Sequence, residues 1–379
     1  MHVPLISGQM MAIARVVSAV DGQKHGVIRL FQETPGSNVT VSGSLTGLQP
    51  AGSQVGFHIH KFGDLTSRDC TAAQGHWNPT NQDHGGPDTL IRHIGDLGNI
   101  QINENGEAQV KIVMGPEDLP LTGPHGVVGR MLVVHGKGDD LGARNLGDSR
   151  LTGNTGAPIA CGVIGIGGIT PEGFEPGSGS FDRKPSPGQR RLVAQISSAK
   201  DLKQSLGTVV IEQSAPGLAY LVTGQFRNIK PINAFHGVHI LQLGDFVQDD
   251  CTGSGGHYNP LNQGHGGLLM PKRHLGDLTN VFINFLGENL IWSLLVPENS
   301  LSLVGPMSIV GRMLAITEGQ DNLGHKRTVS SNTTGDSGPI LGCGVLGIAS
   351  DFSPADGATL SHHSVVTLSL TMTISLYIT

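Results

Sequence analysis

Short apolar runs, partly alternating with polar residues, recur along the chain. Residues 12–20 (AIARVVSAV), 26–33 (GVIRLFQE) and 38–48 (NVTVSGSLTGL) have this pattern, and residues 207–213 and 218–226 repeat it. A period of two residues is typical of half-buried β-strands, and no long stretch keeps the period of an α-helix. The pattern predicts an all-β protein built from antiparallel sandwiches or barrels.

The two halves of the chain are copies of one unit. CTAAQGHWNPTNQDHGG (70–86) returns as CTGSGGHYNPLNQGHGG (251–267), and RHIGDLGN (92–99) returns as RHLGDLTN (273–280). The offset is 181 residues over these segments and 182 in the last part of the unit, so one insertion separates two collinear copies. The sequence therefore contains a tandem duplication and not a short-period solenoid.

The repeats divide the chain into four predicted parts. Domain 1 covers residues 12–167 and domain 2 covers residues 190–349. Between them, residues 168–189 contain 12 Gly, Pro or Ser residues in 22 positions, which is typical of an extended linker. Residues 350–379 form a tail whose last 15 residues are apolar but too short to span a bilayer. An extra strand, a loose tail and a lipid-anchor signal are the alternatives for it.

Composition and charge indicate which kinds of ligand the protein binds. The net charge is −6 and no basic run occurs, which argues against nucleic-acid binding. Aromatic residues make up 4% of the chain, whereas 56 residues are glycine, as expected for short strands joined by loops. The 17 histidines are many for this length and they cluster, which indicates metal binding.

Cysteines and sequons bear on the compartment. The four cysteines permit two disulfides but do not require an oxidising environment. Asn38 and Asn332 stand in sequons that would suit a secreted glycoprotein, although the N-terminus has no clear signal peptide. We therefore expect an extracellular protein, with the cytoplasm as the alternative.

Domain 1 carries a constellation of metal-binding residue types. His58 and His60 stand two apart in a predicted strand, which places both side chains on one face. The remaining candidates follow between loop glycines: His76, His84, His93, Asp96 and His135. Imidazole is a good ligand for copper and zinc, and three imidazoles with one carboxylate make a plausible tetrahedral zinc site.

Six segments of domain 1 resemble those of the copper/zinc superoxide dismutase family, in the family's order. They are GFHIHKFGD, GHWNP, HGGP, RHIGDLGN, GRMLVVHGKGDDLG and GNTGAPIACGVIGI. The resemblance covers nearly all of residues 12–167 and extends more weakly over about 190–349. It implies an eight-stranded Greek-key β-barrel for each copy, with superoxide anion as the substrate and copper and zinc as cofactors.

The same resemblance implies roles for individual residues of domain 1. Copper would be bound by His58, His60, His76 and His135, and zinc by His76, His84, His93 and Asp96. His76 would bridge the metals and donate the catalytic proton, and Asp139 would accept hydrogen bonds from one histidine of each set. Cys70 and Cys161 would form a disulfide.

One position in domain 1 departs from the family pattern. The family places an arginine three residues before the second cysteine, where it docks the superoxide anion, and this chain has Pro158 there. Proline offers neither charge nor a side-chain donor, so we expect weaker anion guidance and slower turnover. Arg144 and Arg150, in the same loop, either compensate in part or face solvent.

Domain 2 keeps the zinc residues and loses copper ligands. His257, His265, His274, Asp277 and Asp321 match the domain 1 set, as do Cys251 and Cys343. Leu241 replaces His60, Thr317 replaces His135, and Pro339 again stands at the arginine position. His236 could replace a copper ligand, but it better matches a structural histidine of the family, and its spacing of three from His239 puts it on the other face of the strand. His325 is a remote second candidate. We expect one copper and two zinc ions per chain.

Two functions remain open from the sequence. The first is a superoxide dismutase that works through domain 1 alone. The second is a metal-binding or transport protein without dismutase activity, because tandem domains with eroded copper sites resemble pernin-like bivalve haemolymph proteins. Under either hypothesis the copies could pair through the family's dimer surface, as an intramolecular pseudo-dimer or in a homo-oligomer.

Overall fold

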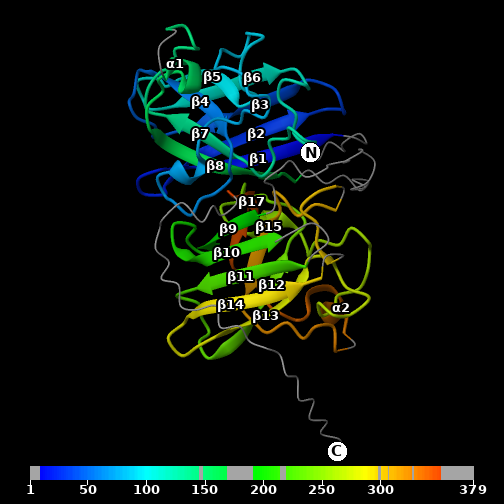
Figure 1. Cartoon of the computed structure of the whole chain (residues 1–379). Helices are drawn as coiled ribbons and strands as arrows, with labels where there is room; N and C mark the ends of the chain where they lie inside the picture. The colour runs from blue at the N-terminus through cyan, green and yellow to red at the C-terminus, as the bar shows by residue number, and fades with distance from the viewer. Residues whose placement is uncertain are drawn as a thin grey trace, which may run out of the picture.

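The fold is seen in a computed structural model of the whole chain. It describes residues 9–144, 148–168, 191–213, 219–297, 300–305, 307–326 and 328–350. Nearly all of the predicted linker (168–189) and of the predicted tail (350–379) lies outside these residues, so the expectations for both stay predictions. The regular secondary structure of the described part is almost entirely β-strand, arranged in two barrels (Figure 1).

The first barrel is an eight-stranded antiparallel sheet with the order β5-β4-β7-β8-β1-β2-β3-β6. Its strands are β1 (Met10–Ser18), β2 (Lys24–Gln32), β3 (Val39–Leu45), β4 (Gln54–His60), β5 (Asp96–Gln101), β6 (Ala108–Met114), β7 (Met131–His135) and β8 (Pro158–Ile166). The edge strands β5 and β6 approach each other, so the sheet is nearly closed. The crossovers from β3 to β4 and from β6 to β7 are those of a Greek-key barrel, as predicted.

The second barrel repeats this order as β13-β12-β15-β16-β9-β10-β11-β14. Its strands are β9 (Arg191–Ser198), β10 (Ser205–Gln213), β11 (Tyr220–Phe226), β12 (Ala234–Ile240), β13 (Asp277–Ile283), β14 (Asn289–Val296), β15 (Met313–Thr317) and β16 (Ile340–Val345). A short strand, β17 (Gly347–Ile348), also pairs with β9, where β8 of the first barrel runs on without a break. The duplication in sequence is thus a duplication of the whole fold.

Alternating burial explains why these segments form barrels. In β3, Val39, Val41 and Leu45 are fully buried, whereas the residues between them are partly or fully exposed. Inward-facing side chains of this kind fill the interior of each barrel, while polar residues face water. The hydrophobic burial of one face fixes the register, since a slip of one residue would turn the apolar set outward.

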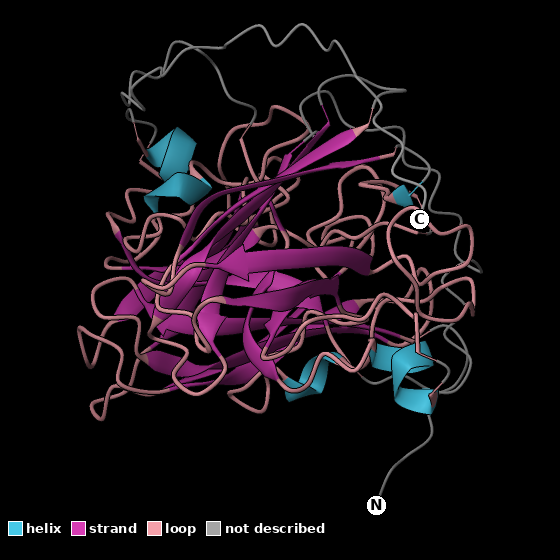
Figure 2. Ribbon diagram, turned by 90° about the horizontal axis from the view of Figure 1, so that it is seen from below, coloured by secondary structure: helices cyan, strands magenta, loops and turns pink. Residues whose placement is uncertain are grey.

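Long loops carry the few helical turns and are tied down by disulfides. The turns are η1 (Thr71–Ala73), α1 (Ser149–Thr152), η2 (Thr252–Ser254) and α2 (Val329–Thr334), and they lie at the periphery in Figure 2. Cys70 is bonded to Cys161 of β8, and Cys251 is bonded to Cys343 of β16, which confirms both predicted pairings. Among the described residues, no helix is both long and apolar enough to cross a membrane.

The barrels contact each other through a pseudo-twofold set of backbone hydrogen bonds. The Gly63 amide donates to the Ile348 carbonyl and the Ile348 amide to the Gly129 carbonyl, at 2.8 and 2.7 Å. The equivalent residues with the two domains exchanged form the same pair of bonds. The Gly244 amide donates to the Ile166 carbonyl at 2.8 Å, and the Ile166 amide donates to the Gly311 carbonyl at 2.7 Å.

Glycine is required at this contact because the two backbones nearly touch. A β-carbon at Gly165 would collide with the Gly244 carbonyl, and one at Gly347 would collide with that of Gly63. The two barrels therefore contact each other within one chain. Pairing through the family's dimer surface stays a prediction.

Candidate metal centres

The first barrel gathers its histidines where β4, β5 and β7 meet the loop between β4 and β5. His58 and His60 come from β4, and His135 ends β7. His60 forms an isolated β-bridge with His76, which brings the loop histidine to the strand pair. All seven ligand candidates of the domain are at least nine-tenths buried.

Four imidazoles converge at one point of this region. One nitrogen each from His58, His60, His76 and His135 lies within 4.8 Å of the others, and the Nε2 atoms of His60 and His135 are 3.1 Å apart. His58 Nδ1 and His76 Nε2 are buried and have no hydrogen-bond partner among the described residues. Buried nitrogens without partners are costly, so the arrangement fits a bound cation. Four imidazoles are a donor set suited to copper.

A second cluster surrounds one carboxylate oxygen. Asp96 Oδ1 lies 2.8 Å from His76 Nδ1, 3.0 Å from His84 Nδ1 and 3.1 Å from His93 Nδ1. Asp96 Oδ2 accepts hydrogen bonds from the backbone amides of Gly85 and His93, which hold the carboxylate in this orientation. Three imidazoles and one carboxylate fit a tetrahedral zinc ion. His76 belongs to both clusters, with Nε2 toward the first and Nδ1 toward the second.

Asp139 connects the two clusters by contacting one histidine of each, on the ring nitrogen that faces away from its cluster. Its Oδ2 lies 2.9 Å from His58 Nε2, and its Oδ1 lies 2.8 Å from His84 Nε2. Each contact fixes the nitrogen of the ring that does not face a cluster, which leaves Nδ1 of both histidines free to bind a metal. Asn99 supports Asp139 in turn, because its side-chain oxygen accepts from the Asp139 amide at 2.7 Å.

Electrostatics favour cations in this region. Burial lowers the pKa of His58 to about 3 and that of His135 to about 4, so both imidazoles are neutral and available as ligands at neutral pH. Burial lowers the pKa of His84, but hydrogen bonds to Asp139 and Asp96 outweigh it and raise that pKa to about 9. Burial opposes ionisation of Asp96, yet its histidine partners hold its pKa well below the usual range. An ionised carboxylate of this kind attracts a divalent cation.

The second barrel repeats the zinc-type cluster. Asp277 Oδ1 lies 2.8 Å from His257 Nδ1, 2.9 Å from His265 Nδ1 and 3.2 Å from His274 Nδ1. Asp321 repeats the role of Asp139, with His265 Nε2 at 2.7 Å and His239 Nε2 at 3.0 Å. Both carboxylates have counterparts in the first barrel, and the cluster fits a zinc ion equally well.

The four-imidazole cluster has no counterpart in the described part of the second barrel. Leu241 forms the β-bridge with His257 that His60 forms with His76, and its side chain is buried among apolar residues. Thr317, at the end of β15, directs its hydroxyl to the carbonyl oxygens of Gly237 and Gly319. Only His239 and His257 remain at this position, with ring centroids 3.9 Å apart.

The two alternative copper ligands of the second barrel lie apart from its metal-type cluster. The ring nitrogens of His236 lie 2.8 Å from the Thr317 carbonyl oxygen and 2.9 Å from that of Pro231, so both are occupied by backbone. His325 is in a turn after Asn322 and joins no metal-type cluster among the described residues.

A cavity of about 970 Å³ opens onto three of the four imidazoles of the copper-type cluster in the first barrel. His60, His76, His135 and Pro158 line it, and so do the cations Lys137 and Arg144. Lys137 is not among the site residues predicted from the sequence; its place two residues after His135 is the signal that points to it.

The two loop arginines differ in position. Arg144 lines the cavity, its guanidinium lies 3.9 Å from Asp140, and its side chain is 74% exposed. Arg150 does not line the cavity and pairs with Asp83 at 3.7 Å instead. Of the two arginines proposed as compensation for Pro158, only Arg144 is therefore placed to act on an anion that enters the cavity.

Comparison with known proteins identifies the family. The model of the copper/zinc superoxide dismutase family (SODC) matches residues 24–164 and again 205–346. The extracellular superoxide dismutase [Cu-Zn] of Onchocerca volvulus is 46% identical over 153 residues, which cover 40% of this chain and 74% of that protein.

Two further relatives have similar identity. The superoxide dismutase [Cu-Zn] of Cryptococcus neoformans var. grubii is 43% identical over 156 residues, 41% of this chain and 99% of that protein. The extracellular superoxide dismutase [Cu-Zn] of Drosophila melanogaster is 44% identical over 160 residues, 41% of this chain and 86% of that protein. The resemblance to pernin-like proteins stays a prediction. With two matches to the family model, one in each barrel, the chain belongs to the copper/zinc superoxide dismutase family in a tandem two-domain form.

Proposed function

We propose that domain 1 (residues 12–167) binds one copper and one zinc ion and dismutates superoxide to oxygen and hydrogen peroxide, whereas domain 2 (190–349) binds zinc alone. The observation that carries this proposal is the difference between the two copies. Four imidazoles converge in the first barrel, three of them on the wall of a cavity, whereas Leu241 and Thr317 stand in the second barrel at the positions of His60 and His135. Copper would be held by His58, His60, His76 and His135, and zinc by His76, His84, His93 and Asp96.

The residues of domain 1 would divide the work as follows. Copper, when bound, supplies reversible one-electron redox chemistry, and zinc supplies a fixed charge. His76 Nε2 carries the proton needed to make peroxide, because this atom faces the other three imidazoles of the copper-type cluster. Asp139 keeps the rings of His58 and His84 oriented through their Nε2 atoms.

Anion approach in domain 1 is the weak step of the proposed reaction. Pro158 lines the cavity without a charge, so docking relies on Lys137 and Arg144. Both side chains belong to exposed residues, and water and salt screen exposed charges. We therefore propose turnover that is slow for this family but not absent.

Domain 2 would act as a structural partner. A zinc ion on His257, His265, His274 and Asp277 ties the long loop after β12 to the start of β13. Structural zinc sites of this donor type add directly to folding stability.

The alternative function is metal binding or transport outside the cell, without dismutase activity. Pro158 and Pro339 leave both copies without the arginine, and the two disulfides suit an oxidising compartment. Two of the relatives described above are named as extracellular superoxide dismutases, which supports secretion.

Restoring the arginine separates the two functions. In the copper- and zinc-loaded chain, Pro158→Arg should raise the superoxide dismutation rate constant about tenfold at low salt, because a cation at the cavity attracts the anion. The measurement is pulse radiolysis across ionic strengths, where the variant should also show the steeper salt dependence. Pro339→Arg is the matched control and should change nothing, because the same charge then stands beside a domain without the copper cluster.

The outcomes of this experiment are distinct. Activity in the parent chain that rises in Pro158→Arg supports the dismutase. An inactive parent with an active Pro158→Arg variant decides for the metal-binding protein. Inactivity of both chains, with copper shown to be bound, contradicts the proposed role of domain 1.

A further inference from the structure

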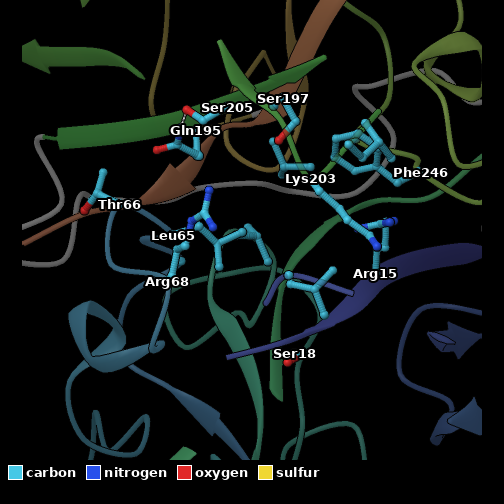
Figure 3. Close-up of a pocket in the computed structure, with 18 of the residues that line it drawn as sticks. Arg15, Ser18, Leu65, Thr66, Arg68, Gln195, Ser197, Lys203, Ser205 and Phe246 are labelled. Atoms are coloured by element: carbon cyan, nitrogen blue, oxygen red, sulfur yellow. Dashed lines mark hydrogen bonds between the residues drawn. The ribbon is translucent and has the colours of Figure 1, made fainter. Parts of the chain in front are cut away.

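A second cavity, of about 260 Å³, lies between the two barrels and away from the metal-type clusters. Both domains line it, and three cationic residues are among its walls: Arg15, Arg68 and Lys203. The lining includes no carboxylate. Figure 3 shows Arg68 pointing from domain 1 toward Gln195 and Ser205 of domain 2.

The pseudo-twofold relation lets one half of this cleft be compared with the other. Beside the first half, Asp249 of domain 2 pairs with two cations of domain 1, Arg15 Nε at 3.2 Å and Lys24 Nζ at 2.6 Å; of these three residues only Arg15 lines the cleft. The positive charges of that half are thus partly neutralised within the protein.

The second half lacks this neutralisation. The repeat places Gln195 at the position of Arg15, Ser205 at that of Lys24 and Arg68 at that of Asp249. Gln195 donates to the Ser205 hydroxyl at 2.6 Å. Among the described residues, no carboxylate lies within 4.0 Å of the Arg68 guanidinium. Domain 1 thus has the cation Arg68 where domain 2 has an acid. Domain 2 in turn has neutral polar residues at the positions of the two domain 1 cations.

Lys203 adds a further positive charge to the cleft. It belongs to the turn between β9 and β10 and is exposed, and no ion pair forms on it among the described residues. Asp21, an exposed acid of the β1–β2 turn, interacts with Lys203 electrostatically but does not line the cleft. The cleft is therefore a positive site with partly apolar walls, which include Leu65 and Phe246.

We propose that the Arg68 half of this cleft binds a small organic anion that carries a carboxylate or phosphate group. The anionic group would take the two-pronged hydrogen bonds that a guanidinium offers, with the hydroxyls of Ser205 and Ser197 beside it. The apolar body of the ligand would lie along Leu65 and Phe246. Since the volume is just below that of sites for drug-sized molecules, one small ring or short chain fits it.

The test uses the full metal-loaded chain and phenyl phosphate as the probe. Isothermal titration calorimetry should give saturable binding of one probe per chain, and Arg68→Gln should weaken it at least tenfold. Gln195→Glu should weaken it as strongly, because a carboxylate then stands opposite Arg68. Dismutase activity should be unchanged in both variants, since neither residue lines the metal cavity.

Two controls locate the binding. Arg29→Gln removes an exposed arginine of β2 that does not line the cleft and should bind as the parent does. Arg144→Gln removes a cation of the metal cavity and should also bind normally. Absence of saturable binding in the parent, full binding in the Arg68 and Gln195 variants, or loss in Arg144→Gln alone would overturn the proposal. None of these outcomes depends on the proposed dismutase activity.

Discussion

Replacing His60 by leucine and His135 by threonine should strip copper from domain 1 and leave its zinc in place. The double variant gives domain 1 the two residues that domain 2 already has at these positions. Two of the four convergent imidazoles are lost, whereas Asp96 and its three histidines are untouched. Loss of a metal's supporting residues alone costs about 10- to 100-fold in affinity, so loss of two direct ligands should exceed about 100-fold.

The readouts for this variant are metal content after dialysis and dismutase activity. We expect copper to fall to background, zinc to stay at two per chain and activity to disappear. Because the second barrel accommodates leucine and threonine at these positions, failure to fold is not expected, and circular dichroism controls for it. Copper retained at the parent level would show that the four imidazoles are not the copper site.

The reciprocal change should create a second copper site. Leu241→His with Thr317→His restores the two missing imidazoles of domain 2 beside His239 and His257. His239 Nδ1 is already buried without a hydrogen-bond partner among the described residues, as His58 Nδ1 is in domain 1. Asp321 holds the His239 ring from its other nitrogen. Domain 2 thus keeps the hydrogen bond that orients His239, although two of the four copper-type imidazoles are missing.

Copper per chain should rise from one to two in this double variant. Leu241→His alone supplies three imidazoles and should bind copper more weakly than the double variant, which makes it the graded control. Electron paramagnetic resonance of the copper-loaded protein would distinguish a second site of the same geometry from surface binding. If the double variant still holds one copper, residues of domain 2 other than Leu241 and Thr317 also prevent copper binding.

Much of the fold could be predicted from the sequence because its signals are local. The period-two apolar runs indicated strands, and the repeated segments gave two copies with one order of elements. His58 and His60 could be placed on one face because alternate residues of a strand share a face. The disulfide pairing rested on the family resemblance, and both bonds are present.

Other features depend on how distant segments pack, and the sequence could not supply them. Arg144 and Arg150 are six positions apart in one loop, and only the folded loop places Arg144 on the cavity and Arg150 against Asp83. The close approach of the barrels at Gly165 and Gly347 is equally invisible, because many glycines of the chain serve turns instead. The cleft between the barrels is lined by residues of both domains, so it could not be predicted from the sequence of either copy.

We propose that one copy holds both metals and that the other holds zinc only. Elemental analysis of the parent chain, after saturation with both metals and removal of loosely bound ions, tests this difference most directly. We expect one copper and two zinc ions per chain. Two tightly bound coppers, or a single zinc, would contradict it.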